Sequence, residues 1–136
     1  MKINLSYKSD KEFESVNEAG NVLPIDMLTM IEKKAFSPTE LLLAGVVACA
    51  AVDIVSMIKK RRKTFIDLNA ETNGVRKDDH PRGFKEINLK YIITSPDLTN
   101  DELSKIIELA VIKYCSVAES LDKNIQLTHS FEIVRA

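Results

Sequence analysis

The sequence contains few of the residues from which metal and cofactor sites are usually built. It has two histidines and two cysteines among 136 residues, and they form no C-x-x-C or H-x-x-x-H pair. Because zinc sites need several such ligands at short spacings, we expect neither a metal nor a cofactor. His80 lies in a polar loop and His129 in the last expected strand, and we interpret both as ordinary side chains.

The sequence also lacks an excess of charge of either sign. Lys and Arg number 19 and Asp and Glu 20, which gives a formal net charge of −1. A balanced chain has no electrostatic attraction for nucleic acid or for an anionic membrane, so we expect neither partner. The first residues contain no apolar segment of the export type, which favours a cytoplasmic location, where thiols stay reduced unless they react.

Long hydrophobic runs are absent except in residues 41–58. The uninterrupted apolar part, residues 41–52, is shorter than the roughly 20 residues that a membrane span needs. Asp53 and Ser56 follow it on the same segment. We therefore predict a buried core helix here and no membrane span.

No internal repeat and no Pro/Gly-rich linker divides the chain, and its length predicts a single domain over residues 1–136. Short apolar runs in the first 25 residues predict two or three antiparallel strands with a turn at residues 17–20. Two further strands are expected at residues 66–72 and 84–94, and a last one at residues 125–134.

Two capping boxes mark the starts of the expected long helices. Ser37-Pro-Thr-Glu40 combines an N-cap serine, a proline at the first helical position and a glutamate three residues after the cap. This helix should run to about Lys60 and, being apolar on nearly all sides, should be covered by other elements. Thr99 opens the second box, and a break near residues 114–116 leads into a shorter third helix. The order β-β-(β)-α-β-β-α-α-β predicts an α+β fold.

The two cysteines lie in different local settings, and three interpretations stay open: inert core residues, a structural disulfide or a redox-active pair. Cys115 lies just before the short helix, whose first residues Ser116-Val-Ala-Glu119 form a capping box, and a helix N-terminus favours a thiolate. Cys49 lies mid-helix, one turn before Asp53, whose charge opposes a thiolate on the same face. Composition alone favours a small buried hydrophobe at Cys49.

Three polar residues of the first long helix are further candidates. Glu40 is either a carboxylate near Cys49 or the second member of the capping box, and a rotation of about 900° onto the opposite face favours the cap. Thr39 is rotated by only about 80° from Cys49, though it lies two to three turns away along the axis. Asp53 is either a site residue or a buried structural group, and a buried acid needs a partner. The candidate partners are Arg82, Lys113, Tyr114 and Ser116.

Residues 37–49, followed far downstream by residues 114–121, resemble the cysteine motifs of the OsmC/Ohr family, and more closely its OsmC-like branch. Residues 53–56, 81–84, 87–89 and 128–131 also fit that branch, so the resemblance covers nearly the whole chain. It implies a small α+β fold in which antiparallel sheets wrap around two long central helices in an intertwined homodimer. Two active sites would then lie at the subunit interface.

The resemblance also implies an activity. In characterised members the cysteine that matches Cys49 is peroxidatic and attacks an organic hydroperoxide, which leaves a sulfenic acid. The cysteine that matches Cys115 resolves this acid as a disulfide, and a dithiol reductant restores both thiols. No metal or haem takes part in this cycle, so the expected small-molecule partners are a hydroperoxide and a dithiol.

Two positions differ from the family's pattern. The family's catalytic carboxylate directly follows the proline, whereas here Thr39 has that place and Glu40 comes next. The family's N-terminal strands carry an arginine that contacts the reactive thiolate, whereas the first arginine here is Arg61. Arg82, in the long loop, is a candidate substitute.

Our leading hypothesis is a cytoplasmic thiol protein that reduces organic hydroperoxides, and the alternative is a non-peroxidase dimer that binds a small apolar ligand in an interface pocket. The expected catalytic residues are Cys49 and Cys115. The expected supporting residues are Thr39, Glu40, Asp53 and Arg82.

Overall fold

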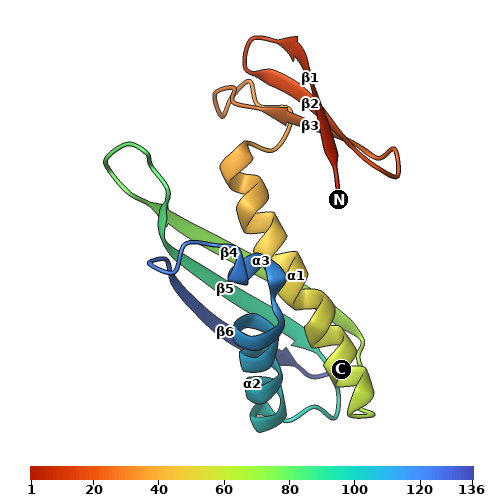
Figure 1. Cartoon of the computed structure of the whole chain (residues 1–136). Helices are drawn as coiled ribbons and strands as arrows, with labels where there is room; N and C mark the ends of the chain where they lie inside the picture. The colour runs from red at the N-terminus through yellow and green to blue at the C-terminus, as the bar shows by residue number, and fades with distance from the viewer. The chain divides into compact units, whose positions relative to one another are not determined.

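The computed structural model describes all 136 residues, which form two compact units, Met1–Leu42 and Leu43–Ala136 (Figure 1). The elements in chain order are β1 (Ile3–Ser9), β2 (Glu12–Asn17), β3 (Val22–Asp26), α1 (Pro38–Lys60), β4 (Asp67–Arg76), β5 (Phe84–Thr94), α2 (Asn100–Glu108), η1 (Leu109–Tyr114), α3 (Ser116–Glu119) and β6 (Gln126–Val134). The predicted α+β class and element order are confirmed. A single domain over the whole chain stays a prediction.

The first unit contains a three-stranded antiparallel sheet in the order β1-β2-β3. β1 pairs with β2 from Ile3 opposite Asn17, and β2 pairs with β3 up to Val16 opposite Val22. Gly20, in the turn between β2 and β3, has φ of +87°, a conformation that glycine adopts without strain. The predicted N-terminal strands and their turn are confirmed.

The connection from β3 to α1 is tied to the sheet by Asp26, whose side chain is buried. Its carboxylate accepts hydrogen bonds from the Lys33 ammonium at 2.8 Å and from the backbone N–H groups of Lys34 at 2.9 Å and Leu28 at 3.3 Å. These bonds, that of Lys33 above all, lower the pKa of Asp26 to about 2. One ionised side chain therefore holds the start and the middle of this loop together.

The second unit contains a mixed sheet in the order β4-β5-β6. β4 and β5 are antiparallel, whereas β5 and β6 are parallel. The prediction of antiparallel sheets therefore needs correction at this pair. Parallel neighbours require a crossover connection, and α2, η1 and α3 supply it.

The core of the second unit lies between one face of this sheet and the helices α1 and α2 (Figure 1). The alternate residues of β5 that were expected on one face are all fully buried: Ile87, Leu89, Tyr91 and Ile93. α1 contributes a stripe at four-residue spacing: Val46, Ala50, Ile54 and Ile58. α2 contributes Leu103, Ile106 and Ile107. The alternate residues of the strand and the helix residues at four-residue spacing thus pack against one another in one apolar layer.

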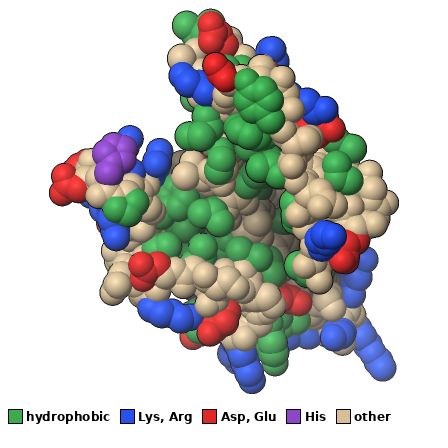
Figure 2. All heavy atoms as spheres, turned by 45° about the horizontal axis from the view of Figure 1, so that its top comes forward, with side chains coloured by type: hydrophobic (Ala, Val, Ile, Leu, Met, Phe, Trp, Pro, Cys, Tyr) green, Lys and Arg blue, Asp and Glu red, His purple; other side chains and the backbone are tan.

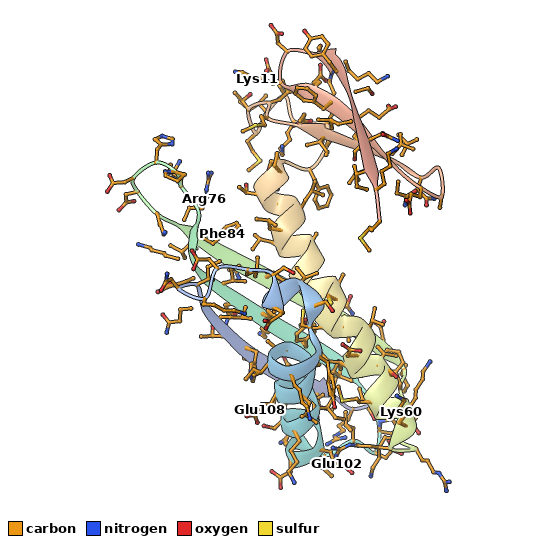
Figure 3. All side chains as sticks on the ribbon, viewed as in Figure 1. Lys11, Lys60, Arg76, Phe84, Glu102 and Glu108 are labelled. Carbon is orange, nitrogen blue, oxygen red and sulfur yellow. The ribbon has the colours of Figure 1, made fainter.

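Gly74 on β4 lies close to the side chains of Phe84 and Leu43. A Cβ atom at this position would lie 2.5 Å from the ring of Phe84 and 3.0 Å from the side chain of Leu43. Phe84, which Figure 3 labels at the start of β5, is buried in the core. Glycine at position 74 therefore leaves the space in which the aromatic ring packs.

α1 is covered by its own chain along one stripe only, which differs from the coverage predicted on nearly all sides. Val52 is 70% exposed, and only 22% of the helix's apolar window is buried. By length and composition alone α1 could cross a bilayer, but the core helices of globular proteins meet the same criteria. The chain by itself leaves one apolar face of α1 uncovered.

The capping boxes predicted for the two long helices are both confirmed. At the start of α1, the backbone N–H of Ser37 donates to Glu40 Oε1 at 2.9 Å, and the N–H of Glu40 donates to Ser37 Oγ at 3.3 Å. Thr99 and Glu102 make the same reciprocal pair at the start of α2, at 3.0 Å and 3.2 Å. The second long helix differs from the prediction in one respect, because beyond Glu108 it continues as the π-helix η1.

Candidate thiol site

Cys49 and Cys115, 66 positions apart in the sequence, meet in the second unit. Both are free thiols; Cys49 is half-buried on α1, and Cys115 is only 4% exposed. Cys49 lies close enough to Cys115 to raise the pKa of the Cys115 thiol. The structure therefore brings the two expected catalytic residues to one place, and their catalytic role stays a prediction.

Cys115 occupies the N-cap position of α3, where the sequence pattern had placed Ser116. Its backbone is extended, with φ of −74° and ψ of 105°, and its Sγ accepts a hydrogen bond from the backbone N–H of Ala118 at 3.3 Å. The thiol in turn donates to the carbonyl oxygen of Val46 on α1 at 3.9 Å. The N-cap of α3 is therefore Cys115 and not the expected Ser116. Its sulfur atom accepts the capping hydrogen bond that a hydroxyl oxygen usually accepts.

The surroundings of Cys115 oppose ionisation of its thiol. Burial raises the pKa of Cys115 above its usual value, and the hydrogen bond from the Ala118 N–H acts in the opposite direction. The neighbouring Cys49 raises this pKa further. The expectation that the helix terminus makes Cys115 a thiolate is therefore outweighed by desolvation.

The π-helix η1 immediately precedes Cys115. Its i→i+5 bonding widens the last turns of the helix, and such segments are frequently found at functional sites. The predicted break near residues 114–116 is confirmed, because the helix ends at Tyr114 and Cys115 is extended. This local change of geometry turns the chain so that the Cys115 side chain faces α1.

Tyr91 on β5 lies beside both thiols. It is fully buried, and its hydroxyl donates to the carbonyl oxygen of Val47 at 2.9 Å. Burial first, and then the charges of Cys115 and Cys49, raise the pKa of the Tyr91 phenol well above its usual value. Sequence reasoning placed Tyr91 in the core and missed its position at the site. The sequence did contain a signal for this position, because a tyrosine hydroxyl among the inward Ile and Leu residues of β5 needs a hydrogen-bond partner.

Thr39 and Glu40 lie in the first turn of α1, about 15 Å along the helix axis from Cys49 at 1.5 Å per residue. Hydrogen bonds from the backbone and hydroxyl of Ser37, followed by the Lys33 charge at 3.5 Å, lower the pKa of Glu40. The Thr39 hydroxyl lies 3.5 Å from that of Ser37. Within this chain, the structural role of Glu40 as a cap is the one that its contacts support.

Asp53 and Arg82 are not joined to the thiols by any bond. Asp53 is half-buried and makes neither a hydrogen bond nor an ion pair, so none of its four candidate partners is bonded to it. Tyr114 does line the same cavity as Asp53. Arg82 is exposed, and its Nε donates to the carbonyl oxygen of Lys77 at 3.2 Å within the loop between β4 and β5.

The chain is similar to a described protein family over most of its length. Residues 31–130 match the family model described as OsmC-like protein. The chain is also 39% identical over 103 residues to the protein YhfA of Escherichia coli strain K12. The aligned residues cover 76% of this chain and 77% of YhfA.

Solved structures resemble the whole chain. A hypothetical protein from Aquifex aeolicus VF5 has a TM-score of 0.87 at 27% identity, covering 99% of this chain and 96% of its own. The organic hydroperoxide resistance protein OhrB of Bacillus subtilis has a TM-score of 0.68 at 16% identity, covering 97% and 98%. At that identity the likeness to OhrB concerns the fold alone.

Proposed function

The chain belongs to the OsmC-like family, as its motifs predicted, and from this premise we propose that it reduces organic hydroperoxides with its two cysteines. Cys49 is the peroxidatic thiol and Cys115 the resolving thiol. The observation that carries the proposal is the meeting of these two thiols from separate elements at one site. Membership of the OsmC-like family is consistent with a role in redox or peroxide chemistry.

The burial of the two thiols supports this division of roles. Cys49 is half-buried and so is the thiol that a hydroperoxide can reach, whereas Cys115 is buried. The Cys49 thiolate attacks the terminal oxygen of ROOH, the O–O bond breaks, and ROH leaves after taking up a proton. Cys115 then attacks the sulfur of the Cys49 sulfenic acid, which releases water and forms the disulfide. A dithiol reductant returns both residues to thiols.

A second copy of the chain is the expected protein partner. Apolar side chains lie open at the surface, as Figure 2 shows for one face of the molecule. In the first unit they include Ile3, Leu5, Tyr7 and Leu23, which the strand register places on one face of the sheet. Contiguous apolar surface of this kind marks an interaction site, and together with the open face of α1 it supports a homodimer with the thiols near the interface. We place this dimer in the cytoplasm.

The test is to add one equivalent of cumene hydroperoxide to the reduced protein and follow free thiols and intact mass. We expect rapid loss of both thiols and a mass decrease of about 2 Da, the two hydrogens lost on disulfide formation. Cys115→Ser should lose its one thiol with a gain of about 16 Da, the oxygen of a sulfenic acid. Full peroxide reduction by Cys49→Ser would refute the assignment.

A second function is binding of a small apolar ligand at the dimer interface, with the cysteines merely lining the pocket. It is favoured by the position of Arg82, whose side-chain bond lies within its own loop and does not reach the thiols. Thiols that survive the hydroperoxide for an hour would support this alternative. Alkylation of Cys49 at neutral pH no faster than that of free cysteine would support it as well, because a catalytic thiolate reacts faster.

A further inference from the structure

Two side chains from different elements bond to the same turn of α1. The Tyr91 hydroxyl on β5 donates to the carbonyl oxygen of Val47 at 2.9 Å. The Cys115 thiol donates to the carbonyl oxygen of the preceding residue, Val46, at 3.9 Å. Cys49 follows these two carbonyls by two and three positions on the same helix. Figure 1 shows α1 lying across the sheet that contains β5, with α3 beside the helix. The turn before Cys49 is therefore bonded both from the sheet and from the crossover segment.

Both bonds are additional to the hydrogen bonds of the helix itself. A carbonyl oxygen inside an α-helix accepts from the N–H four residues later, and its second lone pair stays available. Val46 and Val47 lie in the interior of α1. The bonds from Tyr91 and Cys115 therefore satisfy no carbonyl that would otherwise be unpaired. What they contribute is the position of this turn relative to β5 and to the crossover segment.

The two bonds respond differently to oxidation of the thiols. Disulfide formation removes the hydrogen from each sulfur, so Cys115 can no longer donate to Val46. The Tyr91 phenol takes no part in this reaction. Burial and the charges of both thiols raise its pKa, so it stays a protonated donor. In the disulfide form, Tyr91 therefore supplies the remaining one of these two bonds to the turn that precedes Cys49.

We propose that Tyr91 is a positioning residue for the thiol pair, because its bond to Val47 holds the α1 turn that carries Cys49 within reach of Cys115. It acts through the backbone of α1 and keeps the turn in place after Cys115 has lost its own bond to the helix. Two bonds share this role in the dithiol form, and one carries it in the disulfide form. Loss of the Tyr91 hydroxyl therefore disfavours the disulfide more than the dithiol. The inference rests on the proposed function for the disulfide that the pair forms.

The experiment measures the equilibrium between the dithiol and the disulfide without any peroxide. Wild type and Tyr91→Phe are equilibrated in mixtures of reduced and oxidised dithiothreitol, trapped with a maleimide and counted by intact mass. The oxidised dithiothreitol takes two electrons and two protons from the pair, so the exchange balances. Tyr91→Phe should lower the equilibrium constant for the protein disulfide about three- to tenfold, the effect of one hydrogen bond. This raises the reduction potential by about 15–30 mV.

The matched control is Ser95→Ala, which removes another buried hydroxyl from the same unit. The Ser95 Oγ accepts from the Leu98 N–H at 3.2 Å, beyond the end of β5, and makes no bond to α1. Ser95→Ala should lower the unfolding temperature and leave the disulfide equilibrium constant unchanged. If Tyr91→Phe leaves this constant unchanged, or if both variants lower it equally, the role of Tyr91 is merely structural and the proposal is overturned.

A double-mutant cycle on the reduced protein tests the sharing of the role directly. Cys115→Ala removes the bond to Val46, whereas Cys115→Ser keeps a donor there. Tyr91→Phe should therefore lower the free energy of urea unfolding more in Cys115→Ala than in wild type or in Cys115→Ser. An equal loss in all three backgrounds would overturn the proposal, because the two bonds would then be independent.

The proposed function can fail separately. If cumene hydroperoxide leaves the thiols intact while Tyr91→Phe alone lowers the disulfide equilibrium constant, the peroxidase proposal falls and the positioning role stands. If the hydroperoxide oxidises both thiols and the constant is the same in Tyr91→Phe and wild type, the peroxidase proposal stands and the positioning role falls. A protein that forms no disulfide at any dithiothreitol ratio overturns the positioning role, and the hydroperoxide then tests Cys49 alone.

Discussion

The two units of the chain differ in what holds them together. Every buried apolar residue, from Val46 to Cys115, lies in the second unit, whereas the buried residues of the first are Ser15 and Asp26. Leu5 and Tyr7 on β1 are more than 60% exposed. A three-stranded sheet without an apolar layer is marginal alone, since strand pairing and polar ties do not replace burial. The second unit thus has an apolar core of its own, and the first unit has none.

The largest effect should come from one truncation made in each unit. Leu89→Ala empties a fully buried position and should cost about 2–5 kcal/mol of unfolding free energy. Leu5→Ala removes a side chain that is 62% exposed and should change the stability of the single chain by about 0.5 kcal/mol or less. Urea denaturation of both variants measures the difference.

The same pair also tests the dimer. If a second copy covers β1, the loss caused by Leu5→Ala should depend on protein concentration, and light scattering on dilution should show weaker association. Equal losses in both variants at every concentration would contradict the contrast between the units.

The second effect concerns two glycines used for different reasons. Gly74→Ala places a methyl group against the Phe84 ring in the second unit and should cost about 1–3 kcal/mol by overpacking. Gly20→Ala, in the first unit, meets no atom within 4 Å but must adopt a φ of +87°, which should cost about 1 kcal/mol. Gly83→Ala, which also meets no atom, is the control. Thermal unfolding ranks the three, and a harmless Gly74→Ala would show that the ring can move aside.

The third effect compares the two capping boxes. Thr99→Ala removes the cap of α2, a helix of the core, and should lower the global stability by about 1 kcal/mol. Ser37→Ala removes the cap of α1 at its end in the first unit and should act mainly as local fraying. Amide hydrogen exchange separates the two, since Glu40 should lose protection in Ser37→Ala while the core does not. Loss of protection throughout the second unit in Ser37→Ala would speak against this.

The smallest effect is local and depends on pH. Lys33 and two backbone N–H groups lower the pKa of Asp26 to about 2, and the Thr64 N–H lowers that of Asp97 in the second unit. A lowered folded-state pKa contributes stability above the ordinary Asp value, and this contribution is lost as pH falls through the folded value. The loop held by Asp26 should therefore stay closed to about pH 2. The amide chemical shifts of Lys34 and Thr64 during an acid titration report the hydrogen bonds to Asp26 and Asp97. Asp26→Asn should open the loop that Asp26 holds at every pH.

Local features of the fold were predictable because their causes lie a few residues apart. The boxes at Ser37 and Thr99, and the alternation from Ile87 to Ile93, depend on spacings of two to four residues. The structure reproduces them. The same spacing argument assigned Glu40 to a cap and away from Cys49, and its contacts agree.

Parts of the candidate site were not predictable in this way. The parallel pairing of β6 with β5 depends on where a crossover helix returns the chain. The sulfur cap of Cys115 depends on the π-helix before it, which local propensity does not distinguish from an α-helix. Tyr91 reaches the thiols only because β5 packs beneath α1. Asp53 was expected to have a partner, and packing left it without one.

The sequence by itself determined the strands, the starts of the two long helices, the inward faces and membership of the OsmC-like family, because repeating patterns and short motifs act over a few residues. Only the tertiary structure decided that Cys49, Cys115 and Tyr91 share one site, that burial raises the pKa of Cys115, and that Asp53 opens into a cavity. These outcomes depend on which surfaces of the folded chain pack together and so lose their contact with water. Such burial is a property of the packed core, in which residues far apart in the chain become neighbours.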